Sequence, residues 1–128
     1  MEKMVLDKGA ELFKVDGSSG DPDLERAWLL VADSVFEVFK DRQRKYGPRN
    51  IAKTGEMGVI VRLNDKIERL NNLLLEGRGK DVEDETAIDT WIDAADYPII
   101  ALLCVYGFWP NAPSITKPGG ELRGEGTV

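Results

Sequence analysis

The sequence has 128 residues, 42% hydrophobic and 31% charged, with a net charge of −6, which is typical of one globular domain. No apolar stretch approaches the roughly 20 residues that span a bilayer, and the first residues lack the apolar segment of a secretory signal, so we expect a cytoplasmic protein without membrane contact. The absence of His and the single Cys exclude a Ser-His-Asp triad, a His-ligated zinc site and an intrachain disulfide.

The first helix is predicted at about residues 23–45. Residues 1–20 form an N-terminal arm that ends in the flexible run Gly17-Ser18-Ser19-Gly20. Asp21 then provides a helix cap, and Pro22 suits the first turn. An apolar stripe follows at steps of three and four, formed by Leu24, Trp28, Val31, Val35 and Val38.

A glycine-containing loop is predicted between the first two helices. Tyr46-Gly47-Pro48 ends the first helix, and the loop runs to Gly58. Backbone N–H groups near Gly55–Gly58 would face an anion at the start of the second helix, where Arg49 and Lys53 add positive charge. Tyr46 could stack on a base. The alternative is an ordinary connection between two helices, because the Gly-Lys-Ser/Thr ending of a Walker loop is missing.

Two further helices are predicted, at about residues 58–76 and 84–107. One face of the second helix carries Leu63, Ile67, Leu70 and Leu74. Val61 and Leu75 lie on its opposite side, so we expect a second covered face, and a homodimer provides one. The third helix is expected to turn a different set inward, namely Ile88, Trp91, Ala95, Ile99 and Leu102. The fold is therefore predicted to be an all-α, three-helix domain at residues 21–109, with a flexible tail at residues 110–128.

Charge is distributed unevenly along the chain. Residues 40–80 contain eleven bases and five acids, whereas residues 81–116 contain seven acids and no base. This alternation gives no long basic surface, so we expect no binding to duplex nucleic acid, although the basic middle segment could hold a few phosphates.

Carboxylates follow one edge of the third predicted helix. Glu85, Asp89, Asp93 and Asp96 are spaced four, four and three residues apart, which keeps them within about 80° of one another. The second helix carries its own pair, Asp65 and Glu68. These acids could converge on one or two Mg²⁺ ions, since hard cations prefer oxygen donors and paired divalent ions suit phosphoanhydride cleavage. The alternative is a set of solvated faces with ion pairs to Arg62, Lys66 and Arg69.

Four segments together resemble a family associated with nucleotide modification in phages. They are Lys45-Tyr46-Gly47, Asn50-Ile51-Ala52-Lys53-x-Gly55-Glu56-x-Gly58, Val61-Arg62-Leu63-Asn64-Asp65-Lys66-Ile67-Glu68-Arg69-Leu70 and Glu83-Asp84-Glu85-Thr86-x-x-Asp89-Thr90-x-x-Asp93-x-x-x-Tyr97. As a set, across residues 24–108, they resemble the first type of nucleotide-modification-associated domain. The pattern is more distantly similar to the MazG-like all-α nucleoside-triphosphate pyrophosphatases.

This resemblance implies residue roles at a magnesium and nucleotide site. The magnesium ligands would be Asp65, Glu68, Asp89 and Asp93, joined by Asp96 where the family is expected to have Asn. Among these, Asp65, Glu68 and Asp93 would act in catalysis. Contacts to the nucleotide would come from Tyr46, Arg49, Asn50, Lys53, Arg62 and Lys66.

Three functions are compatible with these residues. The first is a phage nucleotide-handling protein that binds a (deoxy)nucleotide phosphate through Mg²⁺ and, if catalytic, hydrolyses it as a nucleoside-triphosphate pyrophosphatase. The second is a non-catalytic module that binds or sequesters a nucleotide, or an adaptor for a base-modifying enzyme. The third is a helical scaffold whose acids meet a basic partner. The MazG-like resemblance also implies a further Glu-x-x-Glu motif on an earlier helix. The nearest candidates here are Asp33 and Glu37, which are four residues apart where the motif has three, and this departure argues against hydrolysis.

Overall fold

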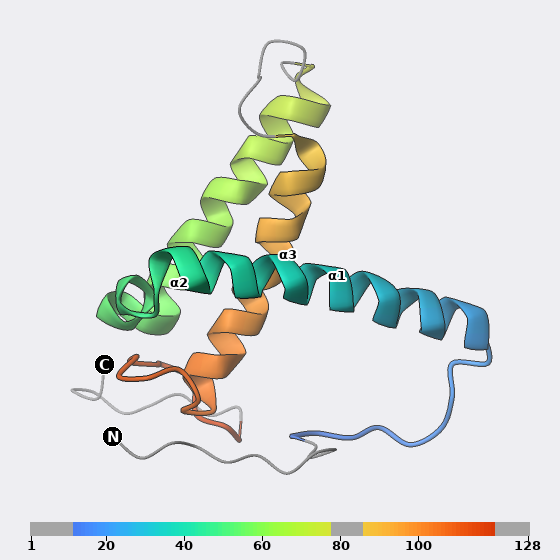
Figure 1. Cartoon of the computed structure of the whole chain (residues 1–128), viewed down its shortest axis with the longest axis horizontal. Helices are drawn as coiled ribbons and strands as arrows, with labels where there is room; N and C mark the ends of the chain where they lie inside the picture. Colours follow the sequence, from blue (N-terminus) through green and yellow to red (C-terminus); the bar gives the residue numbers. More distant parts are fainter. Residues whose placement is uncertain (1–11, 78–85, 120–128) are drawn as a thin grey trace. The chain divides into compact units, whose positions relative to one another are not determined.

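A computed structural model describes residues 12–77 and 86–119 and shows an all-α fold (Figure 1). In these residues the helices are α1 (Pro22–Tyr46), α2 (Arg49–Leu70), a π-helical turn η1 (Asn71–Leu75) and α3 (Ala87–Val105). The predicted fold class with three main helices is therefore confirmed. The chain separates into two compact units, with the boundary inside α1 between Ser34 and Val35. None of the described helices is both long enough and apolar enough to cross a membrane.

The first turn of α1 is fixed by the residues predicted to start it. The Asp21 carboxylate accepts a hydrogen bond from the Leu24 N–H at 3.0 Å, and Pro22 occupies the first helical position. The Ser18 and Ser19 hydroxyls of the preceding segment donate to the Glu25 carboxylate. The predicted cap is thus confirmed, because it satisfies N–H groups that have no partner within the helix. Residues 1–11 of the predicted arm lie outside the described part of the chain.

The predicted loop before residue 58 is wrong, because α2 already begins at Arg49. The Tyr46-Gly47 ending of α1 is confirmed, with Gly47 at a φ of 69°. The helical path then breaks once, at Gly55, whose φ of 59° and ψ of −138° are accessible to glycine and strained for other residues. The glycines in this stretch therefore mark a kink within a helical segment, whereas the sequence suggested an open loop. Past Leu70 the helix widens into η1, where the Glu76 N–H donates to the Asn71 carbonyl.

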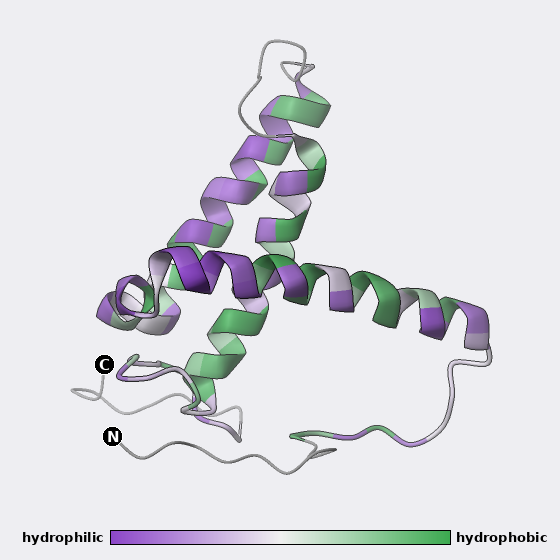
Figure 2. Ribbon diagram, viewed as in Figure 1, coloured by the Kyte–Doolittle hydropathy of each residue, from purple (hydrophilic) through white to green (hydrophobic). Residues whose placement is uncertain are grey.

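A capping box starts α3. The Thr86 hydroxyl accepts from the Asp89 N–H at 3.1 Å, and the Asp89 carboxylate accepts from the Thr86 N–H at 3.3 Å. The helix therefore starts at Ala87, and residues 84 and 85 of the predicted helix lie outside the described residues. Figure 2 shows that hydrophobic residues dominate the C-terminal half of α3.

The inward face predicted for α3 is wrong. Ile88 and Trp91 are 71% and 56% exposed, and Ile99, Leu102 and Ala95 are exposed as well. The helix instead buries a different side, formed by Thr90, Asp93, Ala94, Asp96, Ile100, Cys104 and Val105. A purely hydrophobic criterion selected the wrong face, because the side that packs against the rest of the unit carries two carboxylates and a threonine.

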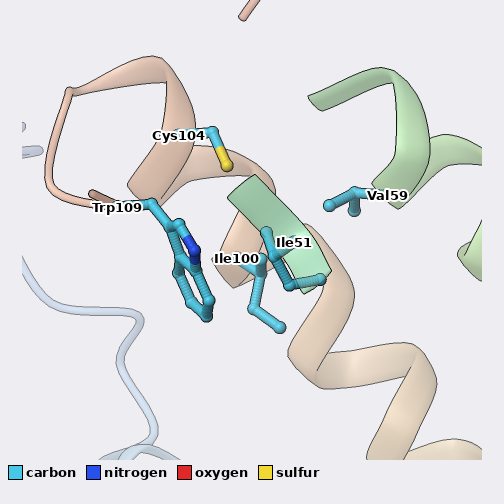
Figure 3. Close-up of a cluster of buried hydrophobic side chains, with 5 residues drawn as sticks. All are labelled: Ile51, Val59, Ile100, Cys104 and Trp109. Atoms are coloured by element: carbon cyan, nitrogen blue, oxygen red, sulfur yellow. The ribbon is translucent and has the colours of Figure 1, made fainter. Parts of the chain in front are cut away.

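The core of the second unit lies where α2, α3 and the segment after α3 meet (Figure 3). It contains Ile51, Val59, Ile100, Cys104 and Trp109. Phe39 of α1 packs edge-on against Trp109, with ring centroids 6.2 Å apart. The Trp109 indole N–H donates to the Pro48 carbonyl at 3.0 Å, which ties the end of α3 to the start of α2. Cys104 is buried as expected, and burial raises the pKa of its thiol.

Part of the predicted flexible tail is held against α2. The Glu56 carboxylate accepts hydrogen bonds from the N–H groups of Ile115 and Thr116 at 2.7 and 2.8 Å and from the Thr116 hydroxyl at 2.7 Å. The Glu56 N–H in turn donates to the Pro113 carbonyl at 3.1 Å. Residues 113–116 are therefore anchored at the Gly55 kink, which differs from the flexible extension expected from residue 110. Residues 120–128 lie outside the described part of the chain.

Candidate functional site

A cavity of about 240 Å³ opens within the second unit, beside the buried side of α3. Its walls come from the last turns of α1, the first turns of α2, one later residue of α2 and the middle of α3. The residues that line it are Phe39, Arg42, Gln43, Tyr46, Gly47, Asn50, Ile51, Arg62, Asp93, Asp96, Tyr97 and Ile100. The cavity thus brings together five predicted site residues, namely Tyr46, Asn50, Arg62, Asp93 and Asp96.

Asp93 is neutralised by two cations. One carboxylate oxygen lies 2.6 Å from Nη1 of Arg42, and the other lies 3.1 Å from Nζ of Lys66. The Asp93 side chain is 9% exposed, whereas those of Arg42 and Lys66 are 40% and 22% exposed, so the carboxylate is buried and its partners reach solvent. A buried carboxylate requires such partners, because an isolated charge is costly to remove from water. Asp93 therefore joins α1 to α2 and α3 as a structural ion pair.

Asp96 shares the buried side of α3 with Asp93 but has a different environment. It is 8% exposed, and within the described residues it forms no ion pair and accepts no hydrogen bond. Burial and the neighbouring Asp93 charge raise the pKa of Asp96 to about 6, against an opposing effect of Arg42. At neutral pH the cavity therefore contains a carboxylate that nothing in the described chain neutralises by direct contact.

Arg62 is the complementary group in the same cavity. Its Nη2 donates weakly to the Asn50 carbonyl at 3.4 Å, and it forms no ion pair with any described residue. Because the Arg42 charge is committed to Asp93, Arg62 is the lining cation that remains available to an anion. The rings of Tyr46 and Tyr97 supply flat apolar surface beside these two charged groups.

Of the five predicted magnesium ligands, only Asp93 and Asp96 line the cavity. Asp65 and Glu68 are exposed on α2 and form no hydrogen bond or ion pair among the described residues, while Asp89 is committed to the capping box. The hydrogen bond from Thr86 lowers the pKa of Asp89. Within residues 12–77 and 86–119, no group of three or more acidic, His or Cys side chains could hold a metal ion. The Mg²⁺ that the resemblance implies therefore stays a prediction, and Glu85 lies outside the described residues.

One donor of the predicted anion site at Gly55–Gly58 already has a partner within the chain. The Glu56 N–H at the kink donates to the Pro113 carbonyl, and the Glu56 carboxylate itself faces the segment after α3. Arg49 and Lys53, which were expected to support that site, are exposed on the first turns of α2 and do not line the cavity. The Pro113 carbonyl thus takes one of the backbone donors on which the predicted site depends.

Seven lining residues were not among the predicted site residues, namely Phe39, Arg42, Gln43, Gly47, Ile51, Tyr97 and Ile100. Three of them belong to the last turns of α1, which had been assigned only a structural role. One signal was present in the sequence: Arg42 is one of several bases that directly precede Tyr46-Gly47, and the acidic third helix lacks bases of its own. That excess of acid required a cation from another helix.

Comparison with known proteins gives no independent assignment. No family model, no curated protein and no solved structure matches the chain. The resemblance to nucleotide-modification-associated domains therefore stays a prediction, and the cavity has to be interpreted from its own chemistry.

Proposed function

We propose that the cavity binds a nucleotide-like small molecule, with its base beside Tyr46 and Tyr97 and its phosphate near Arg62. The observation that carries this proposal is the unpaired Asp96 carboxylate in the same cavity as the unpaired Arg62 guanidinium. A ligand that satisfies both needs a donor edge at one end and an anionic group at the other. A flat aromatic ring between the two would match the tyrosine surfaces, and nucleotides combine all three features.

Asp96 would recognise the base by accepting hydrogen bonds from a ring N–H or an exocyclic amino group. An ionised carboxylate is an acceptor only, so it favours a base edge that presents donors. Arg62 would bind phosphate oxygens, which its guanidinium can contact in bidentate fashion. The cavity volume of about 240 Å³ lies just below the roughly 300–1,000 Å³ of typical small-molecule sites.

The proposed activity is binding without a metal-dependent hydrolytic step. Asp93 is committed to Arg42 and Lys66, and the carboxylates of α2 stay in solvent. The nucleotide class agrees with the resemblance to phage nucleotide-modification-associated domains, which also implies a role beside enzymes that modify nucleotides or bases. On this proposal the chain presents or sequesters the nucleotide, in the host cytoplasm if a phage encodes it.

Calorimetric titration with a panel of nucleosides and nucleotides tests the proposal. We expect at least one nucleotide to bind equally well with Mg²⁺ and with EDTA, and more tightly than its nucleoside because Arg62 contacts phosphate. Asp96→Asn should weaken this binding at least tenfold. Asp65→Asn is the matched control, since it makes the same change at an exposed carboxylate outside the cavity and should leave binding unchanged.

Two results would contradict the proposal. Binding that requires Mg²⁺ and is lost in Asp65→Asn would point to the carboxylate site that the resemblance implies. Chromatography of the incubated mixture provides the second criterion, because release of pyrophosphate or phosphate would show that the chain hydrolyses its ligand. Absence of binding across the whole panel would leave a helical scaffold as the remaining function.

A further inference from the structure

The outer side of α3 is an exposed apolar stripe. Ile88, Trp91, Ile99 and Leu102 are 71, 56, 52 and 43% exposed, and their spacing places them within about 80° of one another on the helix. Thr90, Asp93 and Asp96 are on the buried side of α3, and Asp89 in its first turn is its exposed charged residue. An apolar stripe of this length on a helix normally packs against a partner.

A matching edge runs along α2. Ile60 and Ile67 on α2, with Leu74 of η1, recur every seven residues and are 58, 45 and 53% exposed. Ile60 of α2 and Leu102 of α3 line one hollow of about 570 Å³, so the two exposed edges belong to the same face of the second unit. The floor of this hollow is apolar, with Val59 and Leu63 from α2 and Ala101 from α3. This surface is called the α2/α3 face below.

The first half of α1 also carries an exposed apolar stripe. Leu24, Trp28 and Val31 form a stripe at steps of four and three and are 64, 69 and 62% exposed. No residue from 12 to 34 is buried. A helix whose apolar stripe has no partner gains little stability from packing, which is the main source of helix stability in proteins.

We propose that the Leu24/Trp28/Val31 stripe of one copy of the chain docks on the α2/α3 face of a second copy, with Trp28 in the hollow. Reciprocal docking covers both unpartnered surfaces at once, whereas packing of two α2/α3 faces against each other would leave the α1 stripe exposed. Helix anchors at three- and four-residue steps are the usual way in which a helix occupies such a groove.

Area and charge both fit this arrangement. A helical segment of about twelve residues is about 18 Å long. If half of its surface and an equal area of the facing groove are buried, and the contact occurs twice by symmetry, the dimer buries about 1,200 Å² in total. That value reaches the lower limit for stable interfaces. The first half of α1 carries Asp23, Glu25 and Asp33 against one base, whereas the hollow is lined by Lys117 and by Glu56, whose carboxylate already accepts from the segment after α3. This difference in charge favours the pairing.

Light scattering after size-exclusion chromatography, over a range of protein concentrations, tests the interface. We expect the unaltered chain to have twice the mass of one copy, and Trp28→Asp and Leu102→Asp to dissociate at least tenfold more readily. Leu30→Asp is the matched control. Leu30 is 68% exposed but lies about 200° around the helix from Trp28, so the dimer should persist.

Disulfide trapping distinguishes which copy supplies the helix. A chain with Trp28→Cys and a separate chain with Leu102→Cys, both with Cys104→Ser, are mixed and oxidised; we expect a cross-linked pair, and much less with Leu30→Cys in place of Trp28→Cys. A monomer at every concentration would overturn the proposal. So would a dimer insensitive to Trp28→Asp, which would indicate packing of two α2/α3 faces. A cross-link formed only when both cysteines are in one chain would indicate docking within a single copy and would overturn it equally.

Discussion

Replacement of Asp96 by Asn removes a charge from the cavity without changing the size of the side chain. Asp96 is 8% exposed, and nothing in the described chain pairs with it directly. Its ionised form is therefore disfavoured in the folded state relative to the unfolded chain. We expect Asp96→Asn to increase the free energy of unfolding at pH 7, which is the opposite of the usual effect of a substitution at a buried position.

The magnitude follows from the displacement of the pKa. Burial and the Asp93 charge raise the pKa of Asp96 from 3.8 to about 6. At about 1.4 kcal/mol for each unit, the ionised group costs the native state at most about 3 kcal/mol, and water in the cavity reduces this to about 1–3 kcal/mol. Well below pH 3.8 the carboxyl is protonated in both states and the cost disappears. The advantage of Asn should therefore be only about 0.5 kcal/mol at pH 4, grow between pH 4 and 6 and be nearly complete at pH 7.

Urea unfolding of both proteins at pH 4, 5, 6 and 7, followed by circular dichroism, measures this difference. Asp65→Asn serves as the control, because the same change at an exposed carboxylate should alter stability little at any pH. A loss of stability in Asp96→Asn at pH 7 would refute the reasoning, since it would mean that the carboxylate has a stabilising partner. A gain of equal size at pH 4 would refute it too, because that gain could not come from ionisation.

Three further predictions concern contacts that hold the second unit together. Arg42→Ala removes one of the two cations on Asp93 and should lower the free energy of unfolding by about 2 kcal/mol in urea titrations, whereas adding Asp93→Asn should recover part of that loss. Glu56→Ala removes the acceptor of three hydrogen bonds and should cost about 2–3 kcal/mol and accelerate amide hydrogen exchange at residues 115 and 116. Gly55→Ala would place a Cβ atom 1.9 Å from the Pro113 oxygen, and thermal unfolding should show a loss of more than about 3 kcal/mol or no folded protein.

Local signals in the sequence predicted the helices well. The Asp21-Pro22 start and the Tyr46-Gly47 end of α1 are correct, because caps and helix-ending glycines act through backbone groups only a few residues away. The start of α2 was missed by nine residues. The glycines at 55 and 58 suggested a loop, but only Gly55 departs from helical geometry, and it does so to accommodate Pro113. That contact joins residues distant in the sequence, so no local pattern announces it.

The sequence predicts which residues form the candidate site better than it predicts how those residues contact one another. Tyr46, Asn50, Arg62 and the two carboxylates of α3 do meet in one cavity, yet the pairing of Asp93 with Arg42 depends on how α1 packs against α3. The hydrophobic stripe of α3 was placed inward because apolar residues usually fill a core. Here the ion pair makes the acidic side the buried one, and the apolar side stays exposed. When one predicted helix has an excess of acids and another has an excess of bases, ion pairs between the two helices should therefore be considered first. The buried face of each helix is then assigned with those pairs in place.

The three described carboxylates of the α3 series have separate environments, and this difference argues for a ligand at Asp96. Asp89 is satisfied by the capping box, and Asp93 by two cations from other helices. Asp96 is as buried as Asp93 and has neither kind of partner within the described residues. An unpaired buried carboxylate costs stability unless the structure uses it, and Arg62 lines the same cavity without an ion-pair partner among the described residues. A bound molecule that donates to Asp96 and accepts from Arg62 would remove the cost at Asp96 and pair the Arg62 charge, which is why the cavity, and not the exposed acids of α2, is the place to look for the ligand.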